Sequence, residues 1–490
     1  MNWHTHFIQI GRSGAERYRE VMGRCANELV QLFESAATPY SGLNPDTLQQ
    51  RIAATDLSAN NTATLEDVIK EVRESIAAHS IIVQHPHCIA HLHTPPLISG
   101  LAAESFIAAQ NLSMDSWDQS GAATYVEQRV VNELSRLFGY PAQADGVMTS
   151  GGTQGNIMAL LIARDWFVWN RYQHHVQRDG LPECASKLRI IASARSHFTV
   201  EKAASTMGLG QKAVVRVSSH ADGTMDMVQL EARIQQLQAE GLIPFAVVGT
   251  AGTTDHGAID DLVRINQMAR LHGLWFHVDG AYGSALILSK EKCRLAGIEL
   301  ADSLVLDFHK LWFQPISCGA LLLRDGACFN HLLYKAEYLN RETDDLPNLV
   351  DKTLSTTRRF DALKVYMTLR AIGTHTLGVM IDHLLLLTAA IAEKIQLHSE
   401  FELLAQPCLS TILFRYIAVE AGTSLDAFNR QLRASLLKKG IAVLGETTVN
   451  SCVSLKMTIL NPCLIEADFD ELLKNISNSA YSMRKNCIMS

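Results

Sequence analysis

Between about residues 80 and 375 the sequence alternates short β-rich apolar runs with amphipathic helical stretches. The β-rich runs are RIIASA (189–194), FAVVGT (245–250), LWFHVDGAY (274–282), SLVLDF (303–308) and CGALLLR (318–324). Helical segments such as IDDLVRINQMARLHG (259–273) stand between them. Strands that alternate with helices pair in parallel, and the helices cover both faces of the sheet. The pattern therefore predicts an α/β fold built on a mostly parallel sheet.

Two segments of different character flank this region. In the first 79 residues, YREVMGRCANELVQLFESA and LEDVIKEVRESIAAHS place apolar residues at three- and four-residue spacing, which predicts helices. After about residue 375 a long apolar helix precedes two predicted strands, CLSTILFRY and CVSLKMTIL. We predict an N-terminal helical segment (1–79), a large domain (80–374) and a small α+β C-terminal domain (375–490).

The composition of the 490 residues is that of a globular protein, with 47% hydrophobic and 19% charged residues. A net charge of -7 offers no basic surface for nucleic acid or an anionic membrane. The first twenty residues hold no apolar core of a signal peptide, and LLLLTAAIA (384–392) is too short to span a bilayer. The ten cysteines show no CxxC pair, which is typical of free thiols in a reducing compartment. We predict a cytoplasmic protein with neither a nucleic-acid nor a membrane partner.

Chemically useful residues follow five of the predicted strands. They are the turn SGGTQGN (150–156), His197, Thr253 with Thr254, Asp279, and His309 with Lys310. In open α/β sheets, ligands bind at the carboxyl ends of the strands. We therefore expect these residues to lie together in one site.

Lys310 and Asp279 each have a structural and a functional interpretation. Lysine is rarely buried unless it is paired, and a buried lysine becomes a nucleophile toward carbonyls. Lys310 is thus either a solvated lysine at a strand end or a covalent anchor. Asp279 either caps a turn or is a buried carboxylate, which needs a cationic partner.

The turn SGGTQGN opens the predicted helix NIMALLIARDWF. Glycines let a backbone approach a ligand closely, and a helix N-terminus offers free N–H groups to a phosphate. The alternative is an ordinary tight turn. The turn is neither GxGxxG nor a P-loop, which argues against a dinucleotide-binding dehydrogenase. His197 either begins a helix or stacks on a flat ligand.

The segment HPHCIAHLHT (85–94) could bind a metal, because His85, His87, His91 and His93 would share one face of an extended strand. No carboxylate or cysteine pair completes a recognisable ligand spacing. We favour a segment of the substrate pocket or a packed strand, and we predict no metal.

A phosphate cradle, a carboxylate, a flat histidine and a lysine fit one cofactor, pyridoxal 5'-phosphate. The lysine attaches the cofactor aldehyde through an imine, and the carboxylate keeps the pyridine nitrogen protonated. Backbone N–H groups bind the phosphate.

The order and spacing of six motifs resemble the group II pyridoxal-phosphate decarboxylases of fold type I, from about residue 80 to the C-terminus. The motifs are TSGGTQGN, SHFTVEKAA, GTAGTTDHGAID, FHVDGAYG, DFHKLWFQP and TTRRFDALKVYMTLR. The resemblance implies that Lys310, His197 and Asp279 are catalytic. It implies a cofactor site formed by Gly152, Thr153, His197, Thr254, Asp279, Ala281, His309, Lys310 and Thr357. Of these, Thr357 matches a loop that reaches the phosphate of a partner subunit, which implies a homodimer with shared sites. His91 and Thr94 match the substrate side.

The segments MDSWDQS (114–120) and PNLVDKTLSTTRRFD resemble the branch of L-2,4-diaminobutyrate decarboxylases and siderophore lysine decarboxylases. We therefore expect a diamino acid substrate: lysine, ornithine or diaminobutyrate. Its distal ammonium needs an acceptor, and the nearest candidates are Asp118, Asp115 and Glu127. A siderophore or polyamine pathway would use the product. Glutamate and aromatic substrates, an aminotransferase, and a non-catalytic relative are the alternatives.

Several members of this family carry a tyrosine in a mobile loop, where it protonates the product carbanion. The corresponding loop NRETDDLPNLVDKTL (340–354) contains no tyrosine, and Tyr338 stands just upstream. The proton donor is therefore unassigned, with His197 as a candidate.

Overall fold

The computed structural model describes residues 3–58, 63–341, 343 and 345–488, which form two compact units. Unit 1 comprises residues 1–91, 394–404 and 414–490, and unit 2 comprises residues 92–393 and 405–413. This division differs from the three predicted segments, because the chain before residue 92 bonds to the C-terminal part. Ile89 N–H donates to Val443 O (3.1 Å), and Thr458 N–H donates to Ile89 O (2.6 Å).

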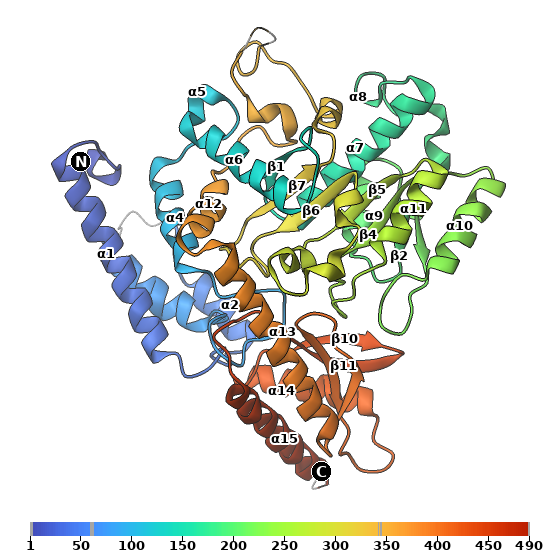
Figure 1. Cartoon of the computed structure of the whole chain (residues 1–490). Helices are drawn as coiled ribbons and strands as arrows, with labels where there is room; N and C mark the ends of the chain where they lie inside the picture. Colours follow the sequence, from blue (N-terminus) through green and yellow to red (C-terminus); the bar gives the residue numbers. More distant parts are fainter. Residues whose placement is uncertain (1–2, 59–62, 342, 344, 489–490) are drawn as a thin grey trace. The chain divides into compact units, whose positions relative to one another are not determined.

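Seven strands form one sheet among the described residues of unit 2, in the order β1-β7-β6-β5-β4-β2-β3 (Figure 1). Strands β2 to β6 pair in parallel, whereas β7 is antiparallel to both β6 and β1. Strand β1 therefore runs in the same direction as the parallel strands, and the predicted, mostly parallel sheet is confirmed. The strands are β1 (Asp145–Thr149), β2 (Leu188–Ser193), β3 (Val214–Val217), β4 (Ile243–Thr250), β5 (Trp275–Asp279), β6 (Ser303–Asp307) and β7 (Gly319–Leu323).

Helices cover both faces of this sheet. Helices α7 (Gly152–Tyr172) and α9 (Thr199–Thr206) share a buried cluster with Val248 of β4 and Val305 of β6. The next residue of β4, Gly249, faces α11 (Leu262–His272), since a Cβ there would lie 3.0 Å from Leu262. Successive side chains of a strand point to opposite faces, so strands covered on both sides are apolar throughout. Each buried valine or leucine contributes roughly 1.5–3 kcal/mol.

Helix α10 also packs on the sheet, against β3 and β4, whereas the remaining helices of unit 2 lie beyond the sheet or at its edge (Figure 1). Helix α12 packs against α4 and α6, and α6 packs against β1. The buried Lys364 of α12 holds this group together: its Nζ lies 2.6 Å from Glu104 of α4 and 2.9 Å from Asp361. These helices are α4 (Ile98–Gln110), α5 (Trp117–Ser120), α6 (Ala122–Leu137), α8 (Val176–Asp179), α10 (Met227–Ala239) and α12 (Ala362–Ala371).

Unit 1 combines N-terminal helices with a C-terminal α+β part. Side chains cap two of these helices: Asn44 accepts from Thr47 N–H before α2, and Thr64 accepts from Asp67 N–H before α3, the helix predicted from LEDVIKEVRESIAAHS. A four-stranded sheet, mostly within unit 1, has the order β10-β11-β9-β8. The elements are α1 (Arg12–Ser35), α2 (Pro45–Ala53), α3 (Leu65–Glu71), β8 (Phe401–Ala405), β9 (Thr411–Tyr416), α14 (Leu425–Lys438), β10 (Gly445–Val449), β11 (Cys452–Thr458) and α15 (Glu466–Ile488).

Two segments differ from the sequence expectation. The apolar run 384–392 belongs to a longer helix, α13 (Gly373–Leu397), which is long and apolar enough to cross a membrane, although 44% of its most apolar window is buried. One such helix is weak evidence, because core helices of soluble proteins meet the same criteria. The histidine-rich segment forms turns rather than a strand, with Cys88 N–H donating to His85 O (2.9 Å). Its histidines therefore do not share a strand face.

Candidate active site

The carboxyl ends of β1, β2, β4, β5 and β6 meet at one edge of the unit 2 sheet and surround a cavity of about 360 Å³. Eight of the nine predicted cofactor residues line it: Gly152, Thr153, His197, Thr254, Asp279, Ala281, His309 and Lys310. Its other lining residues are Ser150, Gly151, Gln154, Asn156, Thr250, Gly252, Tyr282, Asp307 and Ile316. Strand order thus brings together residues that are up to 166 positions apart in the sequence, from Ser150 to Ile316.

The N-terminus of α7 forms one wall of the cavity. Gly151 has a φ of 143°, and a Cβ at this position would lie 2.9 Å from the His309 ring, so only glycine fits. The N-cap residue Gly151 has no side chain to cap the helix, and Gly152 N–H donates to Asp307 Oδ2 (3.2 Å). The first N–H groups of a helix lack acceptors within the helix, which makes this wall suited to an anion.

Asp279 ends β5 and is only 6% exposed. Its Oδ2 accepts from Asn156 Nδ2 (2.9 Å), and its Oδ1 accepts from Ala281 N–H (3.1 Å). Within the described residues it makes no ion pair with a lysine, arginine or histidine side chain. A buried carboxylate without a cation is costly, so Asp279 is suited to a cationic ligand.

Lys310 lies in the turn after β6, beside a carboxylate that sequence reasoning missed. Its Nζ lies 3.2 Å from Asp307 Oδ2, and His309 Nδ1 lies 3.0 Å from Asp307 Oδ1. Asp307 is almost fully buried and also accepts from Gly152 N–H. Its position as the only charged residue of the predicted strand SLVLDF (303–308), three residues before Lys310, was the available signal. Asp307 thus links the lysine to the anion-binding wall.

His197 follows β2 and lines the cavity as a neutral imidazole. Burial, as the largest effect, lowers its pKa, and the nearby carboxylate of Asp279 opposes this shift. Its Nδ1 lies 3.1 Å from Thr199 Oγ1.

Besides Asp115, Glu127 and Thr253, four predicted residues are not among those that line the cavity. Thr357 and Asp118 are exposed. Thr94 is buried, and its hydroxyl donates to Pro95 O (3.1 Å). His91 belongs to unit 1, where burial is the main cause that lowers its pKa. These four assignments stay predictions.

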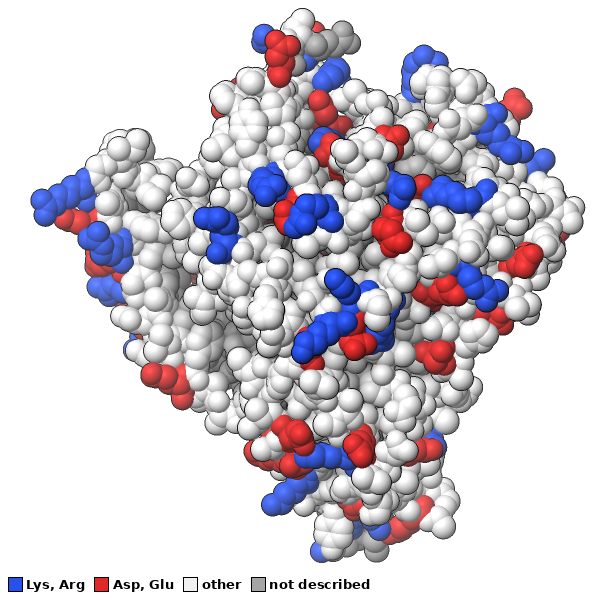
Figure 2. Space-filling model, in the orientation of Figure 1, with Lys and Arg blue, Asp and Glu red and all other residues white. Residues whose placement is uncertain are grey.

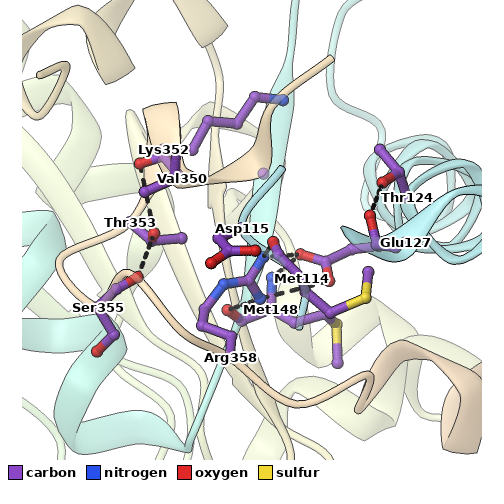
Figure 3. Close-up of polar contacts among 12 residues, drawn as sticks. Met114, Asp115, Thr124, Glu127, Met148, Val350, Lys352, Thr353, Ser355 and Arg358 are labelled. Atoms are coloured by element: carbon purple, nitrogen blue, oxygen red, sulfur yellow. Dashed lines mark hydrogen bonds and ion pairs between the residues drawn. The ribbon is translucent and has the colours of Figure 1, made fainter. Parts of the chain in front are cut away.

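Glu127, the third candidate partner for a substrate ammonium, is already paired. Arg358 donates to both of its oxygens, at 3.0 and 3.3 Å, and Met148 N–H donates to Oε1 (3.0 Å) (Figure 3). Arg358 also donates to the carbonyl oxygens of Met148 (3.1 Å) and Met114 (3.4 Å). Glu127 is 1% exposed and does not line the cavity, so it holds Arg358 in place rather than facing a substrate.

The loop 340–354 corresponds to the one that carries a tyrosine in several family members, and it has no tyrosine in this sequence. Two of its residues, Glu342 and Asp344, lie outside the described residues. Tyr338, just upstream, is 84% exposed and does not line the cavity. His197 remains the candidate donor on the cavity wall.

Comparison with known proteins decides the family. The sequence profile described as "Pyridoxal-dependent decarboxylase conserved domain" matches residues 45–417. The chain belongs to the pyridoxal-dependent decarboxylase family. This decarboxylase has the fold type I architecture expected from its motifs, and it is an enzyme that acts on an amino acid.

Three relatives are similar to this decarboxylase over most of its length. L-2,4-diaminobutyrate decarboxylase of Rhizobium meliloti (strain 1021) is 42% identical over 91% of this chain and 88% of the relative. The protein of the same name from Acinetobacter baumannii is 42% identical over 84% and 83%. A crystal structure from Vibrio parahaemolyticus, of the "glutamate decarboxylase domain of diaminobutyrate-pyruvate transaminase and L-2,4-diaminobutyrate decarboxylase", is 51% identical. It covers 98% of this chain and 99% of that one, with a TM-score of 0.92.

The cavity fits the cofactor of this family. The start of α7 suits a phosphate, Asp279 needs a cation such as a protonated ring nitrogen, and Lys310 lines the same cavity beside Asp307. When bound, pyridoxal phosphate supplies an electron sink for the pair left behind by departing CO₂. Three residues of the chain would serve this cofactor: Lys310 would provide the attaching amine, Asp279 would hold a proton at the ring nitrogen, and His197 would cover one side of the cavity.

Proposed function

We propose that the enzyme decarboxylates L-2,4-diaminobutyrate. The bond between Cα and the carboxylate breaks, CO₂ leaves, and one proton is added to Cα, which yields 1,3-diaminopropane. The similarity to two decarboxylases of this name, each over more than four fifths of the chain, carries the proposal. Lysine and ornithine differ from this substrate only in the length of the side chain, and they remain the alternatives within the diamino acids.

A diamino acid brings a second ammonium group, which needs an acceptor when it is buried. Two carboxylates line the cavity of a single chain, Asp279 and Asp307. The first lacks a cation and suits the ring nitrogen, while the second already lies against Lys310. We infer that the acceptor for the distal ammonium comes from a second subunit.

The segment MDSWDQS is bonded to the segment that leads to Thr357. Val350 N–H donates to Asp115 O (2.9 Å), and Trp117 N–H donates to Asn348 Oδ1 (3.1 Å). If Thr357 completes the phosphate site of a neighbouring subunit, Asp118 would lie near the same site, because the two segments are hydrogen-bonded to each other. We therefore propose a homodimer in which both segments of one subunit complete the site of the other.

Substrate choice is tested with purified protein and added cofactor. The values of kcat/KM are compared for diaminobutyrate, ornithine, lysine, glutamate and tyrosine, with the amine product identified. We expect the highest kcat/KM for diaminobutyrate. A preference for glutamate or tyrosine would overturn the proposal that the substrate is a diamino acid. A preference for lysine or ornithine would overturn only the choice of diaminobutyrate among the diamino acids.

Site sharing is tested by mixing two inactive variants, Lys310→Ala and Thr357→Asp. If sites are shared, each hybrid dimer has one site with both defects and one intact site. Random mixing should then restore about a quarter of the wild-type activity, since half of the dimers are hybrids. If each subunit builds its own site, mixing restores nothing. A cytoplasmic location and a siderophore or polyamine role stay predictions.

A further inference from the structure

A buried chain of hydrogen bonds runs beneath the cavity from β6 to α9. Its central residues are Asn156 of α7 and His277 of β5, both from the sequence motifs but without an assigned role. Each of these side chains is at most 2% exposed. The links are Trp275 Nε1 to Ser303 Oγ (2.8 Å), Ser303 Oγ to His277 Nδ1 (2.8 Å), His277 Nε2 to Asn156 Oδ1 (2.9 Å), Asn156 Nδ2 to Asp279 Oδ2 and to Thr199 Oγ1 (2.9 Å each), and Thr199 Oγ1 to His197 Nδ1 (3.1 Å).

The donor in each link follows from Asp279. A carboxylate can only accept, so the amide nitrogen of Asn156 must face Asp279 and its oxygen must face His277. The Nε2 atom of His277 must therefore carry a proton. Burial lowers the pKa of His277 to about 4, so the ring is neutral and has no second proton. Its Nδ1 accepts from the Ser303 hydroxyl, whose oxygen accepts from Trp275 N–H.

The same reasoning applies on the side of His197. The second amide hydrogen of Asn156 goes to Thr199 Oγ1, so the hydroxyl proton of Thr199 is free to be donated to His197 Nδ1. The backbone N–H of Thr199 also points at this atom (3.4 Å). With two donors on Nδ1, the single proton of a neutral His197 lies on Nε2.

We propose that Asn156, held in one orientation by His277, is a positioning residue that sets two active-site groups at once. It keeps Asp279 as a carboxylate directed at a cationic ring nitrogen, and it holds His197 in the tautomer with the proton on Nε2. Hydrogen bonds donated to a carboxylate favour its charged form. The proposal concerns the chemistry common to every substrate, and it does not depend on diaminobutyrate.

The first test uses the cofactor-free protein. Histidine labelled with ¹⁵N is incorporated, and two-bond ¹H–¹⁵N spectra identify the protonated nitrogen of each ring. The His197→Gln variant assigns the signals of His197. We expect a single tautomer with the proton on Nε2 in the wild type and a mixture of tautomers in Asn156→Ala. A proton on Nδ1 in the wild type, or an unchanged single tautomer in Asn156→Ala, would overturn the proposal.

The second test compares His277→Gln with His277→Phe in the protein loaded with pyridoxal phosphate. Glutamine keeps an N–H group that can reach Asn156, whereas phenylalanine keeps a ring without a donor. The pH dependence of the visible absorption of the bound cofactor is the main readout. We expect the glutamine variant to keep the wild-type profile and the phenylalanine variant to shift it.

The steady-state constants separate positioning from folding. In His277→Phe, kcat should fall about 10- to 100-fold with little change in KM, as for partners that orient metal-ligating residues. Unchanged profiles in both variants, or equal changes in both, would overturn the role of the His277 donor. If His277→Phe does not fold, the tautomer of His197 in Asn156→Ala still decides the proposal.

Discussion

Replacing Glu127 by glutamine separates two roles for this residue. As a partner of a substrate ammonium, Glu127 would affect KM for diamino acids and leave stability unchanged. As the partner of Arg358 it holds the segment before α12 against α6 and β1 (Figure 3). The glutamine side chain has the same shape, so the variant removes the charge and little else.

The size of the effect follows from burial. The side chains of Arg358 and Glu127 are 8% and 1% exposed. Removing one partner of a buried ion pair costs about 3–5 kcal/mol, because the other charge is left buried without compensation. Arg358 keeps its bonds to the carbonyl oxygens of Met148 and Met114, which places the expected loss near 3 kcal/mol, the lower end of that range.

Thermal unfolding measures this loss. Five of the six tryptophans belong to unit 2, so tryptophan fluorescence follows the unit that contains the pair. A domain of this size loses about 2 °C of Tm per kcal/mol, so Glu127→Gln should lower Tm by about 6 °C.

Glu133→Gln is the matched control, because Glu133 is also on α6 and pairs with the exposed Arg136. A surface pair contributes at most about 1 kcal/mol. Equal Tm values for the two variants, or an unchanged Tm with a raised KM in Glu127→Gln, would refute the structural role.

Three further predictions concern the site. Lys310→Ala should stay folded but lose covalent cofactor attachment, and labelling of a different lysine by borohydride in the wild type would contradict this. The Asp307→Asn variant should bind inorganic phosphate and pyridoxal phosphate more tightly, because it removes the negative charge that lies next to Gly152 N–H. Weaker binding of either anion in equilibrium titrations would contradict this prediction. The pKa of His277 is about 4 in the folded chain and 6.5 in the unfolded chain. As the pH falls from 6.5 toward 4, the unfolded chain therefore takes up a proton at this residue and the folded chain does not. Its contribution of about 3 kcal/mol should be lost between pH 6.5 and 4, and His277→Gln should show a shallower fall of Tm over that range than the wild type.

The surface shows how little charge alone reveals about function. On the face drawn in Figure 2, lysine and arginine side chains are interspersed with aspartate and glutamate. The net charge of -7 therefore argues only against a broadly basic surface, and the chemistry had to be read from the strand ends.

The sequence by itself determined the alternation of strands and helices and the polar residues that end the strands. Parallel strands carry their carboxyl ends to one edge, so Asp279, His197 and Lys310 had to meet once the sheet formed. This local rule needs no knowledge of side-chain packing. It predicted seven cofactor residues that line the cavity, and the family resemblance added an eighth, Ala281.

Only the tertiary structure decided which polar side chains face one another. Glu127 and Arg358 are 231 residues apart, Asp307 and Gly152 are 155 apart, and His277 and Asn156 are 121 apart. Hydrogen-bond partners at such separations depend on strand order, register and helix placement, which no local pattern encodes. For that reason the sequence presented Glu127 as a candidate for the substrate, left Asp307 with only its place near a strand end as a signal, and did not single out Asn156 or His277.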